Sequence, residues 1–194
     1  MINPAEIPGY AAAIESERTN RELSFLAQPL PLCGVAVRQM TPRHMLLLKG
    51  VGNRFVTGGR PDAGDVSIFV WLLSMEYTTG HQAQIAFCKK LIKGMNVNKS
   101  IGEVFRFLEM VFQDAPEGTS QDKLYTAPIA SLVDRFASQY GWTTDEILEQ
   151  PLARLFQLSR EITRRFNPQA PMCNKSDRYI GEWLTRQNEK IRNQ

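Results

Sequence analysis

The residues of this chain whose side chains commonly carry catalysis or bind metals are few and widely spaced. The two histidines, His44 and His81, stand 37 residues apart and outside the H-x-x-x-H and H-E-x-x-H patterns of helical metal sites. Three cysteines, Cys33, Cys88 and Cys173, lack the close spacing of a disulfide framework or a zinc site. Neither histidine stands in a motif that would activate a serine or cysteine nucleophile. We therefore expect no enzyme activity, metal or cofactor, and interpret both histidines as helix-start or surface residues.

A glycine pair, Gly58 and Gly59, lies in the segment RFVTGGRPDAGD and superficially suggests a phosphate-binding loop. Phosphate loops need either G-x-x-x-x-G-K-[ST] or, after a strand, G-x-G-x-x-G, so that several backbone N–H groups converge on the ligand. Neither pattern is present in the sequence. We interpret the segment as a surface loop containing a turn.

Another spacing is that of a helix-turn-helix, with Ala137 in a first helix, Gly141 in the turn and Ile147 in a second helix. The second helix would begin near residue 143, and its charged residues are all acidic: Asp145, Glu146 and Glu149. DNA binding depends on neutralising phosphates with lysine and arginine. We therefore expect no nucleic-acid partner, and interpret the spacing as a helix corner with a buried alanine and a left-handed glycine.

Residues 125–166, which contain this corner, have the clearest helical periodicity in the chain. The apolar stripe of the first helix consists of Ile129, Leu132, Val133, Phe136, Ala137 and Tyr140. Thr143 and Glu146 have the spacing of a capping box, and Pro151 suits the start of a longer helix. The face expected to be buried on that helix comprises Leu152, Leu155, Phe156, Ser159 and Ile162. Trp142, at the corner, is expected to pack in the core.

The first hundred residues also consist mainly of helix signals. Thr41 followed by Pro42 predicts a helix over 42–51, Asp65 is expected to cap an apolar helix over 66–77, and another helix is predicted over 81–93. Ser100 and Glu103 are read as a capping box that starts a helix reaching about residue 113. Weak alternation in the segment PLPLCGVAVRQM indicates a short strand. The sequence thus predicts a mainly α, multi-helix globular domain with at most one short β-hairpin near residues 29–40.

We expect three parts in the chain of 194 residues: an N-terminal helical core over 1–113 with a peripheral first helix over 10–27, a helix-corner-helix unit over 114–167 packed on it, and a linker with a C-terminal interaction helix over 168–194. Basic and acidic residues number 11 and 7 in residues 1–100, 3 and 9 in 101–150, and 9 and 4 in 151–194. Two interpretations stay open: scatter on solvated helix faces, or an acidic middle that attracts a basic tail of the same chain or of another copy. The arginines expected on a solvated face are Arg154, Arg160, Arg164 and Arg165.

The predicted C-terminal helix, over 176–192, has an apolar face too narrow to be stable alone in water. Tryptophan on such a helix is a common contact anchor. The residues predicted to bind a partner are Tyr179, Ile180, Trp183, Leu184 and Arg186. The sequence contains neither a signal-peptide pattern nor an apolar run long enough to span a bilayer, so we expect a soluble protein of the cytoplasm without a membrane partner.

Two stretches together resemble the tail assembly chaperones and related small tail-morphogenesis proteins of tailed bacteriophages and prophages: LCGVAVRQMTPRHMLLLKGVGNRFVTGGRPDAGDVSIFVWLLSMEY and YGWTTDEILEQPLARLFQLSREI. The resemblance lies in a capped Leu-rich helix, an F-V-x-G-G-R-P loop, an apolar helix, and a Gly-Trp corner before a proline-led helix. It implies a non-enzymatic, self-associating helical protein that binds tape-measure or tail-tube subunits in the host cytoplasm before assembly. The alternative that we keep open is a structural virion protein at a connector or tail end. A helix-turn-helix DNA-binding protein is the third hypothesis, which the acidic second helix disfavours.

Overall fold

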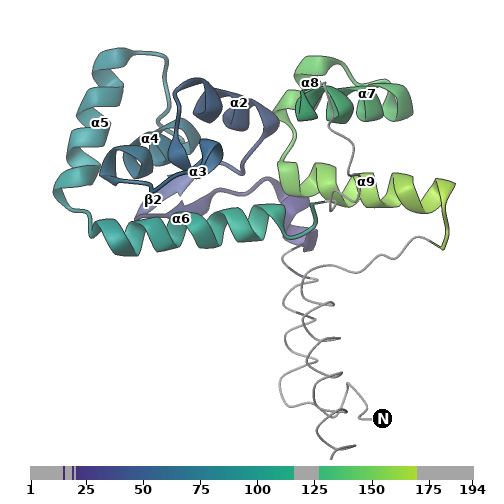
Figure 1. The fold of residues 1–194 in the computed structure, drawn as a ribbon, viewed down its shortest axis with the longest axis horizontal. Helices are drawn as coiled ribbons and strands as arrows, with labels where there is room; N and C mark the ends of the chain where they lie inside the picture. Colours follow the sequence, from purple (N-terminus) through teal and green to yellow (C-terminus); the bar gives the residue numbers. More distant parts are fainter. Residues whose placement is uncertain (1–14, 16–18, 20, 116–126, 170–194) are drawn as a thin grey trace, which may run out of the picture.

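The computed structural model describes residues 15, 19, 21–115 and 127–169 (Figure 1). The predicted C-terminal helix, with Tyr179, Ile180, Trp183, Leu184 and Arg186, lies outside the described residues, as does most of the predicted first helix. The elements in chain order are η2 (Ser24–Leu26), β1 (Leu30–Leu32), β2 (Val35–Val37), α2 (Pro42–Gly50), α3 (Arg54–Thr57), α4 (Ala63–Leu73), α5 (His81–Lys93), α6 (Val97–Phe112), α7 (Pro128–Tyr140), α8 (Thr144–Glu149) and α9 (Leu152–Phe166).

The predicted fold class, mainly α with one short hairpin, is confirmed. Strands β1 and β2 pair antiparallel, with Leu30 opposite Val37 and Leu32 opposite Val35. The turn between them consists of Cys33 (φ 50°) and Gly34 (φ 76°). Positive φ at both central residues gives the tight turn that suits the twist of a hairpin. Cysteine rarely takes this conformation, so no turn signal marks the hairpin in the sequence.

Helix α2 begins as predicted at Thr41 and Pro42, but its capping box is completed by a histidine. The Thr41 Oγ1 atom accepts from the His44 backbone N–H at 3.3 Å, and the Thr41 N–H donates to His44 Nδ1 at 3.1 Å. His44 lies at a helix start, which is one of the two positions predicted for it, and is only 8% exposed. Burial lowers the pKa of the imidazole to about 4.

Helix α4 is the centre of the first core, yet its predicted start and end are wrong. Asp62, not Asp65, is the N-cap, and Asp65 completes the box by accepting from the Asp62 N–H at 3.0 Å. The helix ends at Leu73, because the chain then turns to pair beside β2 through the Val37–Ser74 bridge. Its fully buried apolar side chains are Val66, Phe69, Val70 and Leu73.

Two further corrections concern the segments on either side of the α4–α5 pair. The segment predicted as a loop after α2 contains the short helix α3, which is capped by the side chain of Asn53. Helix α6 starts at Val97 under an Asn96 cap, so Ser100 and Glu103 do not form a capping box. Both lie inside the helix, where Ser100 is buried at the second turn.

The corner between α7 and α8 is built largely as the sequence predicts. Gly141 has φ 68° in the left-handed region, and Thr143 and Glu146 form the capping box. Ala137 is exposed, however, so the predicted buried alanine is wrong, and the neighbouring Phe136 fills the corner instead. Trp142 stacks on Phe136 with ring centroids 5.7 Å apart, as its predicted packing role requires.

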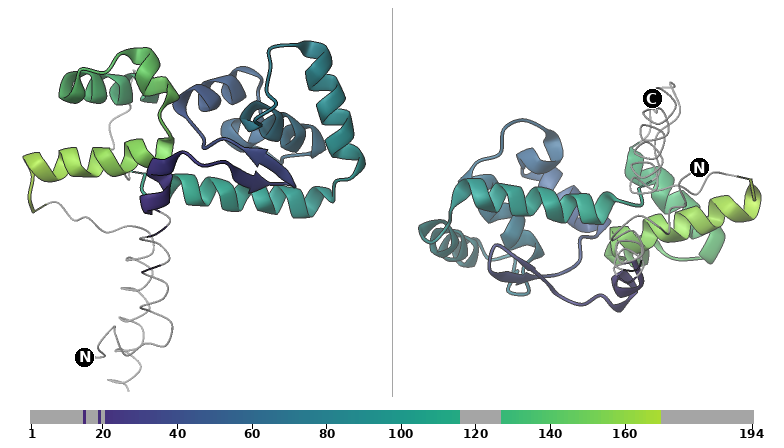
Figure 2. Two further views of the ribbon diagram at one scale, coloured as in Figure 1. Left: turned by 180° about the vertical axis from the view of Figure 1, so that it is seen from behind. Right: turned by 90° about the horizontal axis from the view of Figure 1, so that it is seen from below.

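Helix α9 joins two hydrophobic clusters and buries all five predicted side chains of its stripe. Leu152 and Phe156 belong to the first core, with β2, α2, α4 and α6. Leu155 and Ile162 belong to a second core, with Phe136 and Ile147. The two views of Figure 2 show α7 and α8 lying along α9, beside the larger group of α2 to α6. The 2.8 Å hydrogen bond from the Leu152 N–H to the Met40 carbonyl ties the start of α9 to the first core.

Polar side chains of α9 also hold the segment 21–26, which corrects the solvated-face interpretation for two arginines. Arg154 donates to the Phe25 carbonyl and lies over the Phe25 ring, with its guanidinium carbon 5.3 Å from the ring centroid. Arg160 pairs with Asp114 at 3.0 Å, and Asp114 also pairs with Arg21 at 3.3 Å. Arg164 and Arg165 are exposed, as predicted.

Candidate functional site

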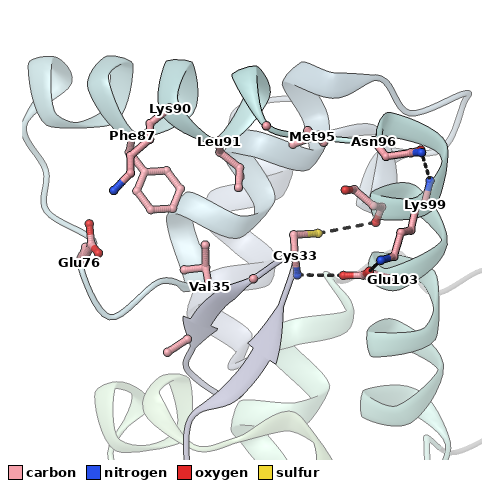
Figure 3. Close-up of a pocket in the computed structure, with 14 residues that line it drawn as sticks. Cys33, Val35, Glu76, Phe87, Lys90, Leu91, Met95, Asn96, Lys99 and Glu103 are labelled. Atoms are coloured by element: carbon pink, nitrogen blue, oxygen red, sulfur yellow. Dashed lines mark hydrogen bonds and ion pairs between the residues drawn. The ribbon is translucent and has the colours of Figure 1, made fainter.

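A groove of about 590 Å³ opens between the hairpin turn, helix α5 and the first turns of α6 (Figure 3). Its size is in the range of protein sites that bind ligands. Segments distant in the sequence form it: the turn and β2 on one side, and α5 with the α5–α6 connection on the other. The residues that determine its chemistry are Cys33, Val35, Phe87, Lys90, Leu91 and Glu103.

The apolar wall of the groove is provided mainly by α5, a helix that is only partly covered. Phe87 contacts Trp71 of α4 with ring centroids 5.0 Å apart, which anchors α5 on the first core. None of the thirteen residues of α5 is buried. On its outer side, Ile85 is 40% and Ile92 is 41% exposed. A helix with this many apolar side chains normally buries a full stripe, so α5 retains apolar surface for a further contact.

The polar wall is organised around the hairpin turn. The Cys33 N–H donates to Glu103 at 3.0 Å, and Glu103 also lies 3.9 Å from the ammonium of Lys99. The Cys33 thiol lies 3.8 Å from the Ser100 carbonyl. Partial burial raises the pKa of this thiol, which disfavours the thiolate needed for nucleophilic chemistry. These contacts hold the hairpin turn against the first turns of α6.

The outer edge of β2 is covered by the chain that follows α4. The Arg38 N–H donates to the Leu73 carbonyl at 2.7 Å, and the Met75 N–H donates to the Ala36 carbonyl at 3.3 Å. Beyond this point the chain turns away, and the Tyr77 N–H bonds to the Ser74 carbonyl at 3.3 Å instead of reaching Gly34. Ala36, the residue of β2 whose backbone groups face away from β1, thus lies opposite Met75, and Gly34 belongs to the turn, with φ 76°.

Two lysines, Lys90 and Lys93, stand near the end of α5 beside the groove. Lys90 lines it, and Lys93 stands one turn further along the same helix. Neither forms an ion pair with any residue in the described part of the chain. Their position in the last turns of α5 complements the helix dipole, which is equivalent to only about half a unit charge. The charged residues that line the groove are Lys90, Lys99, Glu76 and Glu103, so the formal charges of the lining balance.

Nothing in the sequence indicated this groove, since the predicted partner-binding residues lie elsewhere in the chain and outside the described residues. The turn between β1 and β2 and the helix α5 are far apart in the sequence. Only the contact between the hairpin and α5–α6 brings them together. The glycine pair Gly58–Gly59 has positive φ at both residues, consistent with its interpretation as a turn.

Over residues 21–115 and 127–169, no group of three histidine, cysteine, aspartate or glutamate side chains is arranged to hold a metal ion. Within the same ranges, no helix has the length and apolar character needed to cross a membrane. Comparisons of the chain with protein-family models, with curated proteins and with solved structures find no match.

Proposed function

We propose that this protein is a non-enzymatic morphogenesis protein of a tailed phage or prophage, a tail assembly chaperone that binds another tail polypeptide and covers its apolar surface until assembly. The observation that carries the proposal is α5, a thirteen-residue helix with no buried residue that borders an open groove. Such a surface suits reversible protein binding. Covering the exposed part of Ile85 or Ile92 would contribute on the order of 1 kcal/mol each, enough to favour a complex without making it permanent.

The sequence resemblance supports the choice of partner class. Its first stretch corresponds to the hairpin, α2, α3 and α4, and its second to the Gly141 corner, α8 and α9. The resemblance implies self-association and binding to tape-measure or tail-tube subunits. In this proposal the protein acts in the host cytoplasm and leaves the partner when polymerisation replaces it.

The proposal is tested by expressing the tagged full chain from the phage or prophage genome that encodes it, and by identifying bound proteins with mass spectrometry. We expect a tape-measure or tail-tube subunit in complexes from the lysate, and no tagged chain in purified particles. The double variant Ile85→Asp/Ile92→Asp should lose the subunit. Val51→Asp is the matched control, because Val51 is 56% exposed at the end of α2 and should be without effect.

Two results would contradict the proposal in different ways. Stoichiometric retention of the chain in purified particles would identify it as a structural virion protein, for instance at a connector or tail end. Complexes from the lysate that contain no tail protein would exclude both functions.

A further inference from the structure

We infer that a hollow between the segment 21–28, the end of α6 and the start of α9 receives the side chain of Trp183 from a second copy of this chain. The inference goes beyond the proposed function and does not depend on it, because the hollow and the groove beside α5 share no lining residue. Three observations carry it: apolar side chains exposed around the hollow, a buried hydrogen-bond acceptor without a donor, and the place in the chain of the tail that contains Trp183.

The segment 21–26 is held by polar contacts, and its large apolar side chains remain outside. Two of its backbone carbonyls accept hydrogen bonds from Arg154 and Gln157 of α9. The exposed apolar side chains of the segment are Leu23 at 42%, Phe25 at 45% and Leu26 at 59%. Met110 of α6 is 39% exposed and lines the hollow together with Leu23. Exposed apolar side chains that gather at a hollow indicate an interaction site.

The size and chemistry of the hollow define what enters it. Its volume is about 110 Å³, which is the room of roughly three or four water molecules and thus the scale of one side chain. Its apolar lining consists of Leu23, Leu30, Met40, Met110, Val111, Pro151 and Ala153. Gln39 also lines the hollow, and its Oε1 atom is buried and accepts no hydrogen bond from the part of the chain that the structure describes. Because a buried acceptor without a donor is unfavourable, the hollow suits an apolar group that carries a donor.

Tryptophan is the side chain that meets these requirements. It combines a large apolar ring system with one N–H donor and has no acceptor. The sequence contains three tryptophans. Trp71 is 3% exposed within the first core, and Trp142 stacks on Phe136 in the second. We therefore assign the hollow to Trp183, which the sequence predicts to bind a partner and which lies outside the described residues.

The place of the tail in the chain favours a second copy over the same chain. The hollow lies beside the start of α9, whereas residues 170–194 follow its end. The fifteen residues of α9 span about 22 Å. Pro168 and Pro171 stiffen the connection after α9, because proline fixes φ. A stiff connection opposes the reversal by which a tail would run back along its own α9, and exchange of tails between two copies fills both hollows without that reversal.

The test measures self-association of the purified full-length protein by sedimentation equilibrium. The unaltered chain should form dimers, and Trp183→Ala should raise their dissociation constant about tenfold or more, as is typical of a buried tryptophan anchor. Leu23→Asp should have a similar effect. Its matched control is Leu46→Asp, because Leu46 is 43% exposed on α2 and does not line the hollow. Ile85→Asp/Ile92→Asp, which alters the surface of α5, should leave self-association unchanged.

Two further measurements identify the contact. Trp183→Phe keeps an aromatic ring without the donor, and Gln39→Met removes the acceptor, so each should weaken association about fivefold. The double variant should associate as Trp183→Phe does, because the two changes remove the same hydrogen bond. Mixing Leu23→Asp with Trp183→Ala should give tighter association than either variant alone, since the intact tail of the first meets the intact hollow of the second.

Three results would overturn the inference. One is association of Trp183→Ala as tight as that of the unaltered chain. Another is a monomeric full-length protein, and a lower melting temperature of Trp183→Ala would then place the side chain in the hollow of its own chain. The third is the absence of any gain on mixing the two variants. Met110→Asp replaces Leu23→Asp in each measurement if the latter does not fold.

Discussion

His44 acts in this protein through its neutral form. Glutamate or glutamine usually occupies the third helical position of a capping box, where the side chain accepts a hydrogen bond from the N-cap N–H. Here His44 Nδ1 accepts that hydrogen bond from Thr41, so the nitrogen must be unprotonated. Because the imidazole is also buried, its pKa falls to about 4. The start of α2 therefore depends on a group that becomes charged in mildly acidic solution.

We predict that the free energy of unfolding decreases as the pH falls from 6.5 to about 4, because the unfolded chain binds a proton at the ordinary pKa of histidine and the folded chain does not. Above pH 6.5 this contribution of His44 to the free energy of unfolding is fully present, and about 3 kcal/mol of it is lost as the pH falls to about 4. Urea denaturation at about pH 7 and about pH 4.5 measures the effect. His44→Gln keeps an acceptor for Thr41 and should lack this part of the pH dependence. An unchanged pH dependence in His44→Gln would show that other groups cause it.

Gly141 is the second residue whose own conformation determines local structure. Its φ of 68° is costly for residues with a β-carbon, while a β-carbon at this position would meet no other atom within 4 Å. We predict that Gly141→Val costs about 1–2 kcal/mol of stability through backbone strain alone. Gly141→Asn should cost clearly less, because asparagine tolerates the left-handed region. Thermal denaturation of both variants tests this, and equal melting temperatures for the two would refute the explanation by φ.

Single residues were predictable where the deciding signal is local. Thr143 and Gly141 act through groups within a few positions, so their roles follow from the sequence. The start of α4 was misplaced because Asp62 and Asp65, three residues apart, both carry acceptors, and the structure uses both. The role of Cys33 was not predictable at all. Its N–H donates to Glu103, which lies 70 residues further along the chain.

At the level of elements, the contact between the segment 21–26 and α9 shows why the spacing of the arginines along α9 did not predict which of them are exposed. Arg154 and Arg160 are spread around α9 in a way that indicates solvent exposure. Their partners come from far along the chain: the Phe25 carbonyl and Asp114. The Asp114 side chain is only 4% exposed and lies between Arg21 and Arg160. A buried carboxylate between two guanidinium groups links the start of the described chain, the end of α6 and the middle of α9.

We predict that Asp114→Ala destabilises the protein by about 3 kcal/mol or more, since removing one member of a buried ionic group leaves the others without its charge. Arg43→Ala is the contrasting variant. Arg43 pairs with Asp145 at 2.9 Å and with Glu149, but all three side chains are at least 43% exposed. Arg43→Ala should therefore lower the free energy of unfolding by less than about 1 kcal/mol.

Chemical denaturation measures both variants, and limited proteolysis locates the effect. Asp114→Ala should make residues 21–28 more susceptible to cleavage, because the segment loses its ionic contact. A variant as stable as the unaltered protein would show that the segment is held by its other contacts, including the hydrogen bonds from Gln157 to the Arg21 carbonyl and Ser24.

At the scale of the whole molecule, the structure changes the electrostatic expectation for the acidic middle of the chain. Three of its acidic residues pair with arginines of the described chain: Asp114, Asp145 and Glu149. Two of these pair with Arg43 of α2, which lies in the N-terminal part. The acidic region therefore contributes to contacts within the chain, and fewer of its charges remain for a basic tail. The composition of a segment revealed its net charge, but only the fold reveals which charges are already matched.

The last prediction concerns the residues after position 173, which include the proposed contact residue Trp183. The buried members of both hydrophobic clusters in the described chain lie between Leu32 and Ile162. We therefore expect that truncation before Asn174 leaves the protein folded, with a melting temperature close to that of the full chain. Oligomers or partner complexes should weaken, since burying a tryptophan side chain contributes about 2–3 kcal/mol. Analytical ultracentrifugation and thermal denaturation of both proteins decide between two arrangements. A smaller mass with an unchanged melting temperature places the segment on a neighbouring chain, whereas an unchanged mass with a lower melting temperature places it on its own.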